Sequence, residues 1–312
     1  MGSAVAALGL LTACHLDNDQ SFFPRPVGVY LRIQRQLFWA PEGGTPILLA
    51  QNIRRICGTE NRLLLLHEGR DSISVMEVGT HRHLHHFKLQ DATAITEGKK
   101  QAYLGYAGGV CVYEDDRKGH TLRCGSLPLP AGAGRELIYA HPYLVGTGRD
   151  SLWVVRLTSD KKGVVTNILP LRGQVEALWN ELSGSIAGVT RIGDTLYGFG
   201  YSLVNRTFVL SATPTSVRKK QFSPYTQKAF GTEYLGEVAL SVSGFLVPGG
   251  WDRIRDFSCD FLGGKVYCLR EDSVWRYDVA TGEKQFLLYS PQSREVEVVP
   301  IYRYGEAEIT TR

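Results

Sequence analysis

Short apolar stretches recur along almost the whole chain, and turn-forming residues separate them. Each stretch spans only a few residues, is rich in Val, Tyr, Leu and Phe, and is bounded by Gly, Pro, Asp or Asn. This is the pattern of short β-strands. Examples are VGVYLRI (27–33), SISVMEV (72–78), LWVVRL (152–157), TFVLSA (207–212) and KQFLLYS (284–290). The pattern predicts an all-β protein built as a sandwich, a barrel or a propeller.

One segment departs from the strand pattern. In GQVEALWNELSG (173–184) four apolar residues follow the spacing i, i+3, i+4, i+7, namely Val175, Leu178, Trp179 and Leu182. This spacing puts apolar side chains on one face of a helix. We therefore expect one short helix near residues 174–183, docked on the sheets.

Internal similarity favours one of the all-β architectures. Three segments share a template of an apolar strand, a tight turn closing on Asp-Ser and a second strand: 63–78, 143–157 and 265–279; residues 102–114 form a degenerate copy. The aligned turn residues Asp71, Gly108, Asp150 and Asp272 are separated by 37, 42 and 122 positions. A period near 40 with several strands per repeat resembles β-propellers. The resemblance implies six or seven blades, and a pair of β-sandwiches is the alternative.

Composition agrees with a folded domain whose charge is dispersed. The 312 residues are 43% hydrophobic and include 34 Gly and 15 Tyr. The net charge of +4 comes from 35 basic and 31 acidic residues, and no Lys/Arg run is longer than RKK at 218–220. Nucleic-acid binding requires a concentrated basic stripe. We therefore expect no nucleic-acid partner.

The N-terminal segment has the form of an export signal. An apolar run of ten residues, Ala4 to Ala13, is too short to span a membrane and stops at Cys14, after which the chain becomes polar. Leu11-Thr12-Ala13-Cys14 matches the lipobox and so resembles bacterial lipoproteins, although Met1-Gly2-Ser3 lacks the usual Lys or Arg. The alternative is a buried core segment that happens to contain Cys14.

The resemblance to lipoproteins implies a domain organisation and a location. Residues 1–13 would be a signal peptide, Cys14 would be acylated, 14–26 would form a tether, and 27–312 would form the propeller-like body. His15, in place of aspartate after the acylated cysteine, resembles outer-membrane sorting. We expect a periplasmic protein that meets the membrane through its lipid anchor alone.

The other cysteines predict two disulfides. A two-residue Gly263-Gly264 turn would put Cys259 opposite Cys268, and a turn through 116–119 would put Cys111 opposite Cys124. Export makes both disulfides chemically accessible, while reduced core thiols are the alternative. Cys57 is left over as a buried thiol.

Signals of catalysis or of a cofactor are sparse. The chain has no His-Glu-x-x-His, Gly-x-Ser-x-Gly or Walker sequence, and we expect neither a cofactor nor enzymatic activity. In HRHLHH (81–86), His81, His83 and His85 alternate and would share one face of a strand. Side chains on one face lie about 6.5 Å apart, so a solvated face is favoured over a metal site.

These observations predict a non-enzymatic lipoprotein that binds a protein partner. Its export signal, its size and its lack of catalytic motifs resemble lipoprotein immunity proteins paired with type VI secretion phospholipase effectors. The resemblance implies an inhibitor of a periplasm-directed toxin. An outer-membrane assembly propeller and a propeller enzyme or sugar-binding module are the alternatives.

Two regions are candidates for the partner site. Equivalent turns would bring Arg70-Asp71, Arg149-Asp150 and Glu271-Asp272 to one rim, where charged tips are solvated or bind a partner. The segment 216–234 lacks periodicity and combines basic and aromatic residues, among them Lys219, Lys220, Phe222 and Tyr225. It is predicted to contact the partner or to be a surface connection packed by its own aromatics.

Overall fold

We describe the fold from a computed structural model. It describes residues 24–311 except for residues 70, 99–100, 117–118, 126, 128–135, 149–150, 159–162, 172, 182–183, 215–216, 223–228, 235–236, 243–244, 247–253 and 305–307. The predicted signal peptide, Cys14 and most of the predicted tether lie outside the described residues. The first strand begins at Arg25, two residues before the predicted start of the body.

The described residues form seven antiparallel sheets, each with four strands except the first, which has five. Blade 1 consists of β28 (Val296–Tyr304), β1 (Arg25–Ile33), β2 (Gln36–Pro41) and β3 (Ile47–Gln51), with β29 (Glu308–Thr311) beside β28; blade 2 of β4 (Ile53–Thr59), β5 (Arg62–His67), β6 (Ser72–Glu77) and β7 (His83–Lys88). Blade 3 consists of β8 (Ala94–Glu97), β9 (Gln101–Tyr106), β10 (Gly109–Asp116) and β11 (Gly119–Cys124); blade 4 of β12 (Leu137–Ala140), β13 (Tyr143–Thr147), β14 (Ser151–Leu157) and β15 (Gly163–Pro170). Blade 5 consists of β16 (Gln174–Glu181), β17 (Ser185–Ile192), β18 (Thr195–Ser202) and β19 (Phe208–Pro214); blade 6 of β20 (Val217–Phe222), β21 (Ala229–Tyr234), β22 (Glu237–Val242) and β23 (Phe245–Leu246); blade 7 of β24 (Ile254–Asp260), β25 (Lys265–Arg270), β26 (Ser273–Asp278) and β27 (Lys284–Tyr289).

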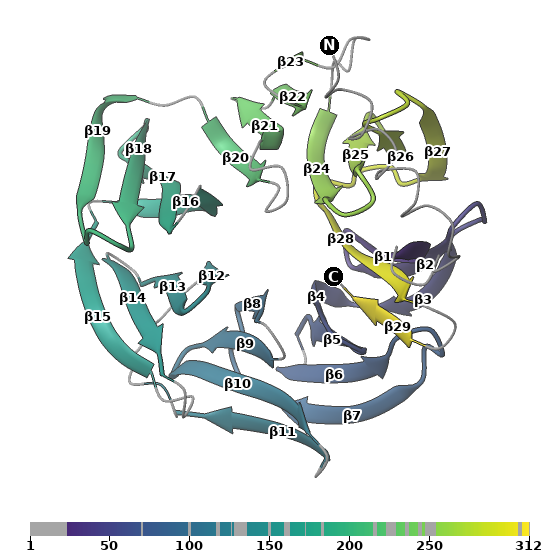
Figure 1. Ribbon diagram of the computed structural model, residues 1–312, viewed down its shortest axis with the longest axis horizontal. Coiled ribbons are helices and arrows are strands. Elements are labelled where there is room, and N and C mark those ends of the chain that lie inside the picture. Colours follow the sequence, from purple (N-terminus) through teal and green to yellow (C-terminus); the bar gives the residue numbers. More distant parts are fainter. Residues whose placement is uncertain are drawn as a thin grey trace, which may run out of the picture.

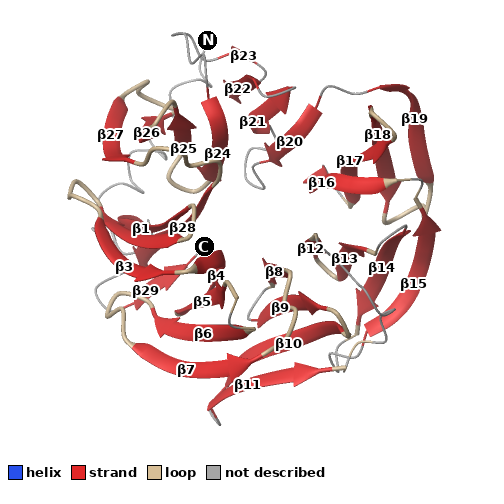
Figure 2. Ribbon diagram, turned by 180° about the vertical axis from the view of Figure 1, so that it is seen from behind, coloured by secondary structure: helices blue, strands red, loops and turns tan. Residues whose placement is uncertain are grey.

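The seven sheets stand around a common centre (Figures 1 and 2). The first strand of each blade lies innermost, and neighbouring inner strands contact one another around the ring, from β28 through β4, β8, β12, β16 and β20. Inner strand β24 contacts β28 and also contacts β21 and β22 of blade 6, so contacts between neighbouring blades run round the whole ring. The predicted all-β propeller is confirmed with seven blades, and the alternative of paired sandwiches is wrong.

Pairing of the two ends of the chain closes the ring. Strand β1 pairs with β28 in antiparallel register, with Val29 opposite Pro300 and Arg32 opposite Glu297. Blade 1 therefore takes its inner strand from the C-terminal end and its other three main strands from the N-terminal end (Figure 1). This pairing covers the strand edges that β1 and β28 would otherwise expose in an open chain, while the outer strand of each blade stays a short sheet edge.

The predicted helix near 174–183 is wrong, because this segment is strand β16. The register of β16 against β17 slips between Val175 and Ala177, so Val175 faces Thr190 and Leu178 faces Gly188. Thr190 and Gly188 are two residues apart and share a face. A β-bulge therefore brings residues three apart onto one face, which imitates the helical spacing. No helix in the described part of the chain is long and apolar enough to cross a membrane.

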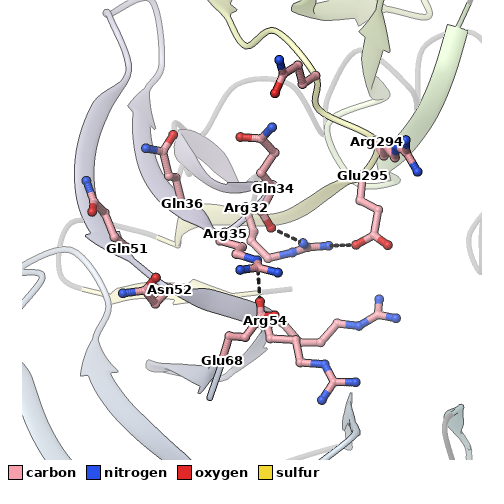
Figure 3. Close-up of a pocket in the computed structure, with 12 residues that line it drawn as sticks. Arg32, Gln34, Arg35, Gln36, Gln51, Asn52, Arg54, Glu68, Arg294 and Glu295 are labelled. Carbon is pink, nitrogen blue, oxygen red and sulfur yellow. Dashed lines mark hydrogen bonds and ion pairs between the residues drawn. The ribbon is translucent and has the colours of Figure 1, made fainter. Parts of the chain in front are cut away.

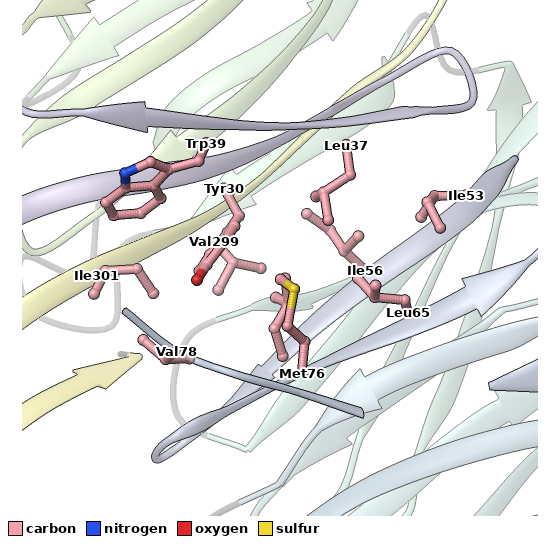
Figure 4. Packing of buried hydrophobic residues seen from close by; sticks show 11 residues of the cluster. Tyr30, Leu37, Trp39, Ile53, Ile56, Leu65, Met76, Val78, Val299 and Ile301 are labelled. Atoms are coloured by element: carbon pink, nitrogen blue, oxygen red, sulfur yellow. The ribbon is translucent and has the colours of Figure 1, made fainter. Parts of the chain in front are cut away.

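Apolar side chains fill the spaces between neighbouring blades. Between blades 1 and 2 the cluster includes Tyr30, Trp39, Ile56, Met76 and Ile301 (Figure 4). Equivalent clusters lie between blades 2 and 3, 3 and 4, 4 and 5, and 7 and 1. Both faces of most sheets are thus buried, which explains why many strands read as continuous apolar runs.

The sequence repeat marks one structural position. The template segments are the β5–β6, β13–β14 and β25–β26 hairpins, and the degenerate copy is β9–β10. All four are the second and third strands of their blades. The separation of 122 between the last two aligned turn residues corresponds to the step of three blades from blade 4 to blade 7, as the period of about 40 predicted.

The structure confirms one predicted disulfide. Cys111 lies opposite Cys124 in the β10–β11 hairpin and is bonded to it, with a Cα–Cα distance of 4.0 Å. The predicted Cys259–Cys268 disulfide is wrong: both are buried thiols, as is Cys57.

The register of the β24–β25 hairpin explains the error. Asp260 pairs with Lys265, so the turn spans four residues rather than two. This shifts Cys259 opposite Val266 and Cys268 opposite Phe257. The two thiols therefore lie diagonally on one face, within the apolar cluster of blade 7.

We expect Cys124→Ser to lower the free energy of unfolding by about 3 kcal/mol, because the disulfide closes a loop with a sequence separation of 13 in the unfolded chain. Cys124 is exposed, so the substitution itself disturbs little packing. Urea unfolding under oxidising conditions measures the change. Reductant should destabilise the wild type to the same extent and leave the variant unchanged; identical unfolding of both proteins without reductant would contradict this prediction.

Candidate functional site

One face of the ring carries the turns between the second and third strands of each blade, together with the connections from each outer strand to the next inner strand. We call it the upper face. In three blades a backbone hydrogen bond joins this turn to the neighbouring connection in an equivalent way: Ile53 N to Arg35 O at 2.9 Å in blade 1, Leu89 N to Asp71 O at 2.8 Å in blade 2, and Ser290 N to Asp272 O at 2.7 Å in blade 7. These bonds hold the turns and connections of those three blades together.

Two adjoining clefts open on the upper face. The smaller, of about 450 Å³, is lined from several blades around the ring's centre, and the larger, of about 720 Å³, lies at the boundary of blades 1 and 2. They share Arg32, Arg55, Arg294 and Glu295. Charged residues dominate the shared wall, so the two clefts form one electrostatic unit.

Glu297 lines the smaller cleft and binds two arginines of the shared wall. Its carboxylate accepts hydrogen bonds from Arg32 Nε at 2.8 Å, from Arg55 Nη1, and from the backbone amide of Ile56 at 3.2 Å. Arg32 also binds Glu295 at 3.0 Å and donates to the carbonyl oxygen of Gln34 at 2.7 Å. The Glu297 carboxylate on β28 therefore joins the Arg32 guanidinium of blade 1 to the Arg55 guanidinium of blade 2.

Burial strengthens the ion pairs of this network, because buried charges are screened less by water and salt. The Arg32 side chain is only 2% exposed, and that of Glu297 is 21% exposed. Burial acts to lower the pKa of Arg55, but Glu297, with Glu136 and Glu295, raises it above its ordinary value overall. Arg55 therefore stays charged, and its position is set by the carboxylates around it.

The larger cleft is lined by polar side chains alone. Its twelve lining residues comprise five arginines, five amide side chains and two glutamates: Arg32, Arg35, Arg54, Arg55, Arg294, Gln34, Gln36, Gln51, Asn52, Gln292, Glu68 and Glu295. Figure 3 shows that Arg35 pairs with Glu68, at 2.8 Å, while Arg32 pairs with Glu295. Five cations against two anions give this lining an excess of three positive charges.

The smaller cleft is balanced instead. Five arginines line it, and they face five carboxylates: Glu136, Glu176, Asp256, Glu295 and Glu297. Arg191 Nε binds Glu176 Oε1 at 2.6 Å, and Asp256 accepts the amide of Val296 at 2.7 Å. Of the two clefts, the larger, over blades 1 and 2, therefore carries the excess of positive charge.

The structure tests the predicted rim in part. Asp71 and Glu271-Asp272 do occupy equivalent turns on the upper face, whereas Arg70, Arg149 and Asp150 lie outside the described residues. Asp71 accepts the backbone amide of Asp91 at 3.3 Å. This contact gives Asp71 a role in fixing its turn, and a partner-binding role for the rim stays a prediction.

The segment 216–234 contains regular structure. It includes β20, the inner strand of blade 6, and β21, with Lys219 opposite Glu233 and Lys220 opposite Thr232. The prediction of an irregular surface stretch is therefore wrong: a bulge on each side of this pairing interrupts the alternation that would have revealed the strands. Phe222 ends β20, and Tyr225 lies outside the described residues. Contact with a partner stays a prediction.

The three histidines do not share one face. A register slip in the β6–β7 pair puts His83 opposite Met76 and His85 opposite Val75, which are neighbours with side chains on opposite faces. His81 precedes the strand, and its Nδ1 lies 2.9 Å from the hydroxyl of Tyr30. Within the described residues, no three His, Cys, Asp or Glu side chains form a group that could hold a metal ion.

Sequence reasoning missed the arginine and glutamate residues of the two clefts. One signal was available: Arg32 stands between Leu31 and Ile33 in an otherwise apolar strand, and a buried arginine requires a carboxylate partner. Its partner Glu297 lies 265 residues away in the sequence. Ring closure creates that pairing, so no pattern in the sequence around either residue reveals it.

We expect Arg32→Ala to lower the free energy of unfolding by about 3 kcal/mol, because it leaves Glu297 partly buried with one cation fewer. Arg35→Ala is the matched control: its side chain is 66% exposed and pairs with Glu68 at the surface, so the expected loss is below about 1 kcal/mol. Urea unfolding compares the two variants. Equal losses would show that the buried network adds nothing beyond a surface ion pair.

Comparisons with known proteins identify the architecture only. No protein-family model matches the chain, and no curated protein sequence matches it. Among solved structures it is similar to a protein from Lactobacillus plantarum (12% identity, TM-score 0.59, 87% of this chain and 99% of that chain), to apo AztD from Citrobacter koseri (11%, 0.57, 90% and 99%) and to the β-propeller domain of Cps50 (Swd1) from Myceliophteria thermophila (10%, 0.55, 84% and 96%). The chain is therefore a seven-bladed β-propeller, and its function has to be inferred from its own upper face.

Proposed function

We propose that this protein is a non-enzymatic binding protein that holds a protein partner against the two clefts of the upper face. The observation that carries the proposal is the lining of the larger cleft, in which all twelve residues are polar and five are arginines. Pockets for small molecules are lined mainly by apolar and aromatic side chains. A lining made wholly of charged and amide groups favours a polar, charged binding partner.

The rigidity of the arginines supports binding of another protein. Arginine is enriched among the residues that dominate the binding energy of protein interfaces. Here Arg32, Arg35 and Arg55 are already held by Glu295, Glu68 and Glu297. Because these side chains are ordered before the partner arrives, little conformational entropy is lost on binding.

The proposal places this binding face on a lipid tether in the bacterial periplasm, as the lipobox at Cys14 suggests. In the version we favour, the protein is an immunity protein that neutralises a periplasm-directed toxin such as a phospholipase effector. A rigid charged face suits that role, since it can cover an effector's active site without chemistry of its own. A propeller for outer-membrane assembly would use the same face for a resident partner.

A polar carbohydrate is the second candidate ligand, and one observation favours it. Five amide side chains line the larger cleft: Gln34, Gln36, Gln51, Asn52 and Gln292. Amide groups both donate and accept hydrogen bonds, as sugar hydroxyls require. In that case the chain would be a sugar-binding module.

The lipid anchor is tested with Cys14→Ser. Removal of the acylated residue should move the protein from the detergent-soluble membrane fraction to the soluble periplasmic fraction, because the acyl chains supply the membrane affinity. Fractionation followed by immunoblotting measures the shift, with the unchanged chain as the control. A variant that still partitions into detergent would remove the anchor from the proposal.

The binding face is tested with a substitution that fills the larger cleft. Gln51→Trp changes an exposed residue of its lining, and Glu60→Trp changes an exposed residue in the turn after β4, on the opposite face. A partner is first cross-linked to the wild-type protein in the periplasm and identified by mass spectrometry. We expect Gln51→Trp to weaken its affinity at least tenfold, about 1.4 kcal/mol, and Glu60→Trp to change it less than twofold.

Two results would overturn the proposal. One is loss of partner affinity in Glu60→Trp but not in Gln51→Trp, which would move the interface to the opposite face. The other is turnover of a small-molecule substrate by the purified protein, abolished by Gln51→Trp. Saturable sugar binding lost in Gln51→Trp, without a protein partner, would select the second candidate.

A further inference from the structure

The arginines of the larger cleft divide into two groups. Arg32, Arg35 and Arg55 each pair with at least one carboxylate. Arg54 donates one hydrogen bond, from Nη1 to the carbonyl oxygen of Ala92 at 3.2 Å, and has no carboxylate partner among the described residues. Arg294 has no ion pair or hydrogen bond with any described residue. Both of these arginines are exposed.

The carboxylates nearby are already engaged. Glu297 uses one oxygen for Arg55 and the other for Arg32 and the amide of Ile56. Glu295 binds Arg32, and Glu68 binds Arg35. Once Glu297 is counted with the two glutamates of the lining, five arginines face three carboxylates. The remaining excess of two positive charges resides on Arg54 and Arg294, whose guanidinium groups are available to an anion from outside.

The positions of the two arginines limit the shape of that anion. Arg54 lies on β4 in blade 2, and Arg294 lies in the connection that leads into β28. In Figure 3 the Arg32–Glu295 pair lies between the Arg54 and Arg294 side chains. Two anionic groups on one extended chain match this arrangement better than a single compact ion.

We propose that the larger cleft binds an acidic, extended segment of the partner protein, with Arg54 and Arg294 each donating to a different carboxylate of that segment. The guanidinium fork matches the geometry of a carboxylate, to which it can donate two parallel hydrogen bonds. Gln51, Asn52 and Gln292 lie in the same lining and supply donors and acceptors for the backbone of the segment. This inference rests on the proposed function, because it names the chemistry of the protein partner.

The volume and the charge of the cleft agree with such a ligand. About 720 Å³ is within the range of sites for small ligands, so a short stretch of chain enters and the rest of the partner lies on the surrounding upper face. The positive potential over blades 1 and 2 would attract acidic protein surfaces and speed their encounter with this face. The balanced smaller cleft would add contacts without attracting charge.

The experiment uses a defined probe and charge-matched variants of the full-length protein. The probe is a fluorescently labelled peptide of ten glutamates, and a peptide of ten glutamines is the neutral probe. The test variant is the double substitution Arg54→Gln with Arg294→Gln. The matched control is Arg82→Gln with Arg156→Gln, which removes two exposed arginines on other surfaces and leaves the same net charge.

Fluorescence anisotropy at low ionic strength should show saturable binding of the glutamate peptide to the wild type and none of the glutamine peptide. We expect the affinity to fall at least tenfold in the Arg54/Arg294 variant and less than twofold in the control, and to fall in the wild type as salt is added. Circular dichroism confirms that both variants fold. Equal losses in the two variants would overturn the inference, because binding would then follow net charge alone.

A competition experiment distinguishes binding of an acidic peptide chain from binding of a simple anion. Inorganic phosphate, added as a competitor at the ionic strength of a matched chloride control, should displace the glutamate peptide no better than chloride does. Displacement by phosphate at micromolar concentration would overturn the inference in favour of a compact anion site.

Failure of this inference and failure of the proposed function give different results. If the glutamate peptide does not bind but Gln51→Trp still weakens the partner, the acidic segment is wrong and the binding face stands. If the peptide binds through Arg54 and Arg294 but the partner is unaffected by Gln51→Trp, the cleft binds acidic chains and the proposed function falls.

Discussion

The antiparallel pairing of β1 with β28 is the constraint on which the rest of the structure depends. It joins the two ends of the chain within blade 1 and turns a row of sheets into a closed ring. Neighbouring blades then contact one another all the way round, and apolar clusters between successive blades bury both faces of most sheets. Without that seam, blade 7 would lose the apolar side chains of β1 and β2 that cover its face, among them Val29, Leu31 and Ala40.

The same seam builds the charged face. Arg32 on β1 and Glu297 on β28 lie directly opposite each other, and Arg55 reaches the same carboxylate from blade 2. A guanidinium this deeply buried is tolerated only when carboxylates and carbonyl oxygens satisfy it. Ring closure therefore fixes a set of arginines on the upper face, and the apolar packing between blades 1 and 2 keeps them in place (Figure 4).

The charge on this face is unevenly distributed between the two clefts. In the smaller cleft, around the ring's centre, arginines and carboxylates are equal in number, so this region has no net charge to attract a charged partner. Over the boundary of blades 1 and 2, arginines exceed carboxylates, and the lining contains no apolar side chain. Recognition there would depend on charge and hydrogen bonding, which favour specificity and fast encounter over a large apolar contact.

The sequence by itself determined the all-β class, the period of the blades, the position of the Asp-Ser turns and the Cys111–Cys124 pairing, because each depends on residues close together in the chain. Only the tertiary structure decided what depends on register or on distant contacts. A bulge at Val175 made a strand look like a helix, a four-residue turn moved Cys259 away from Cys268, and a register slip separated His83 from His85. The charged clefts were hidden for the same reason: Arg32 meets Glu297 across 265 positions, and only ring closure brings the two together.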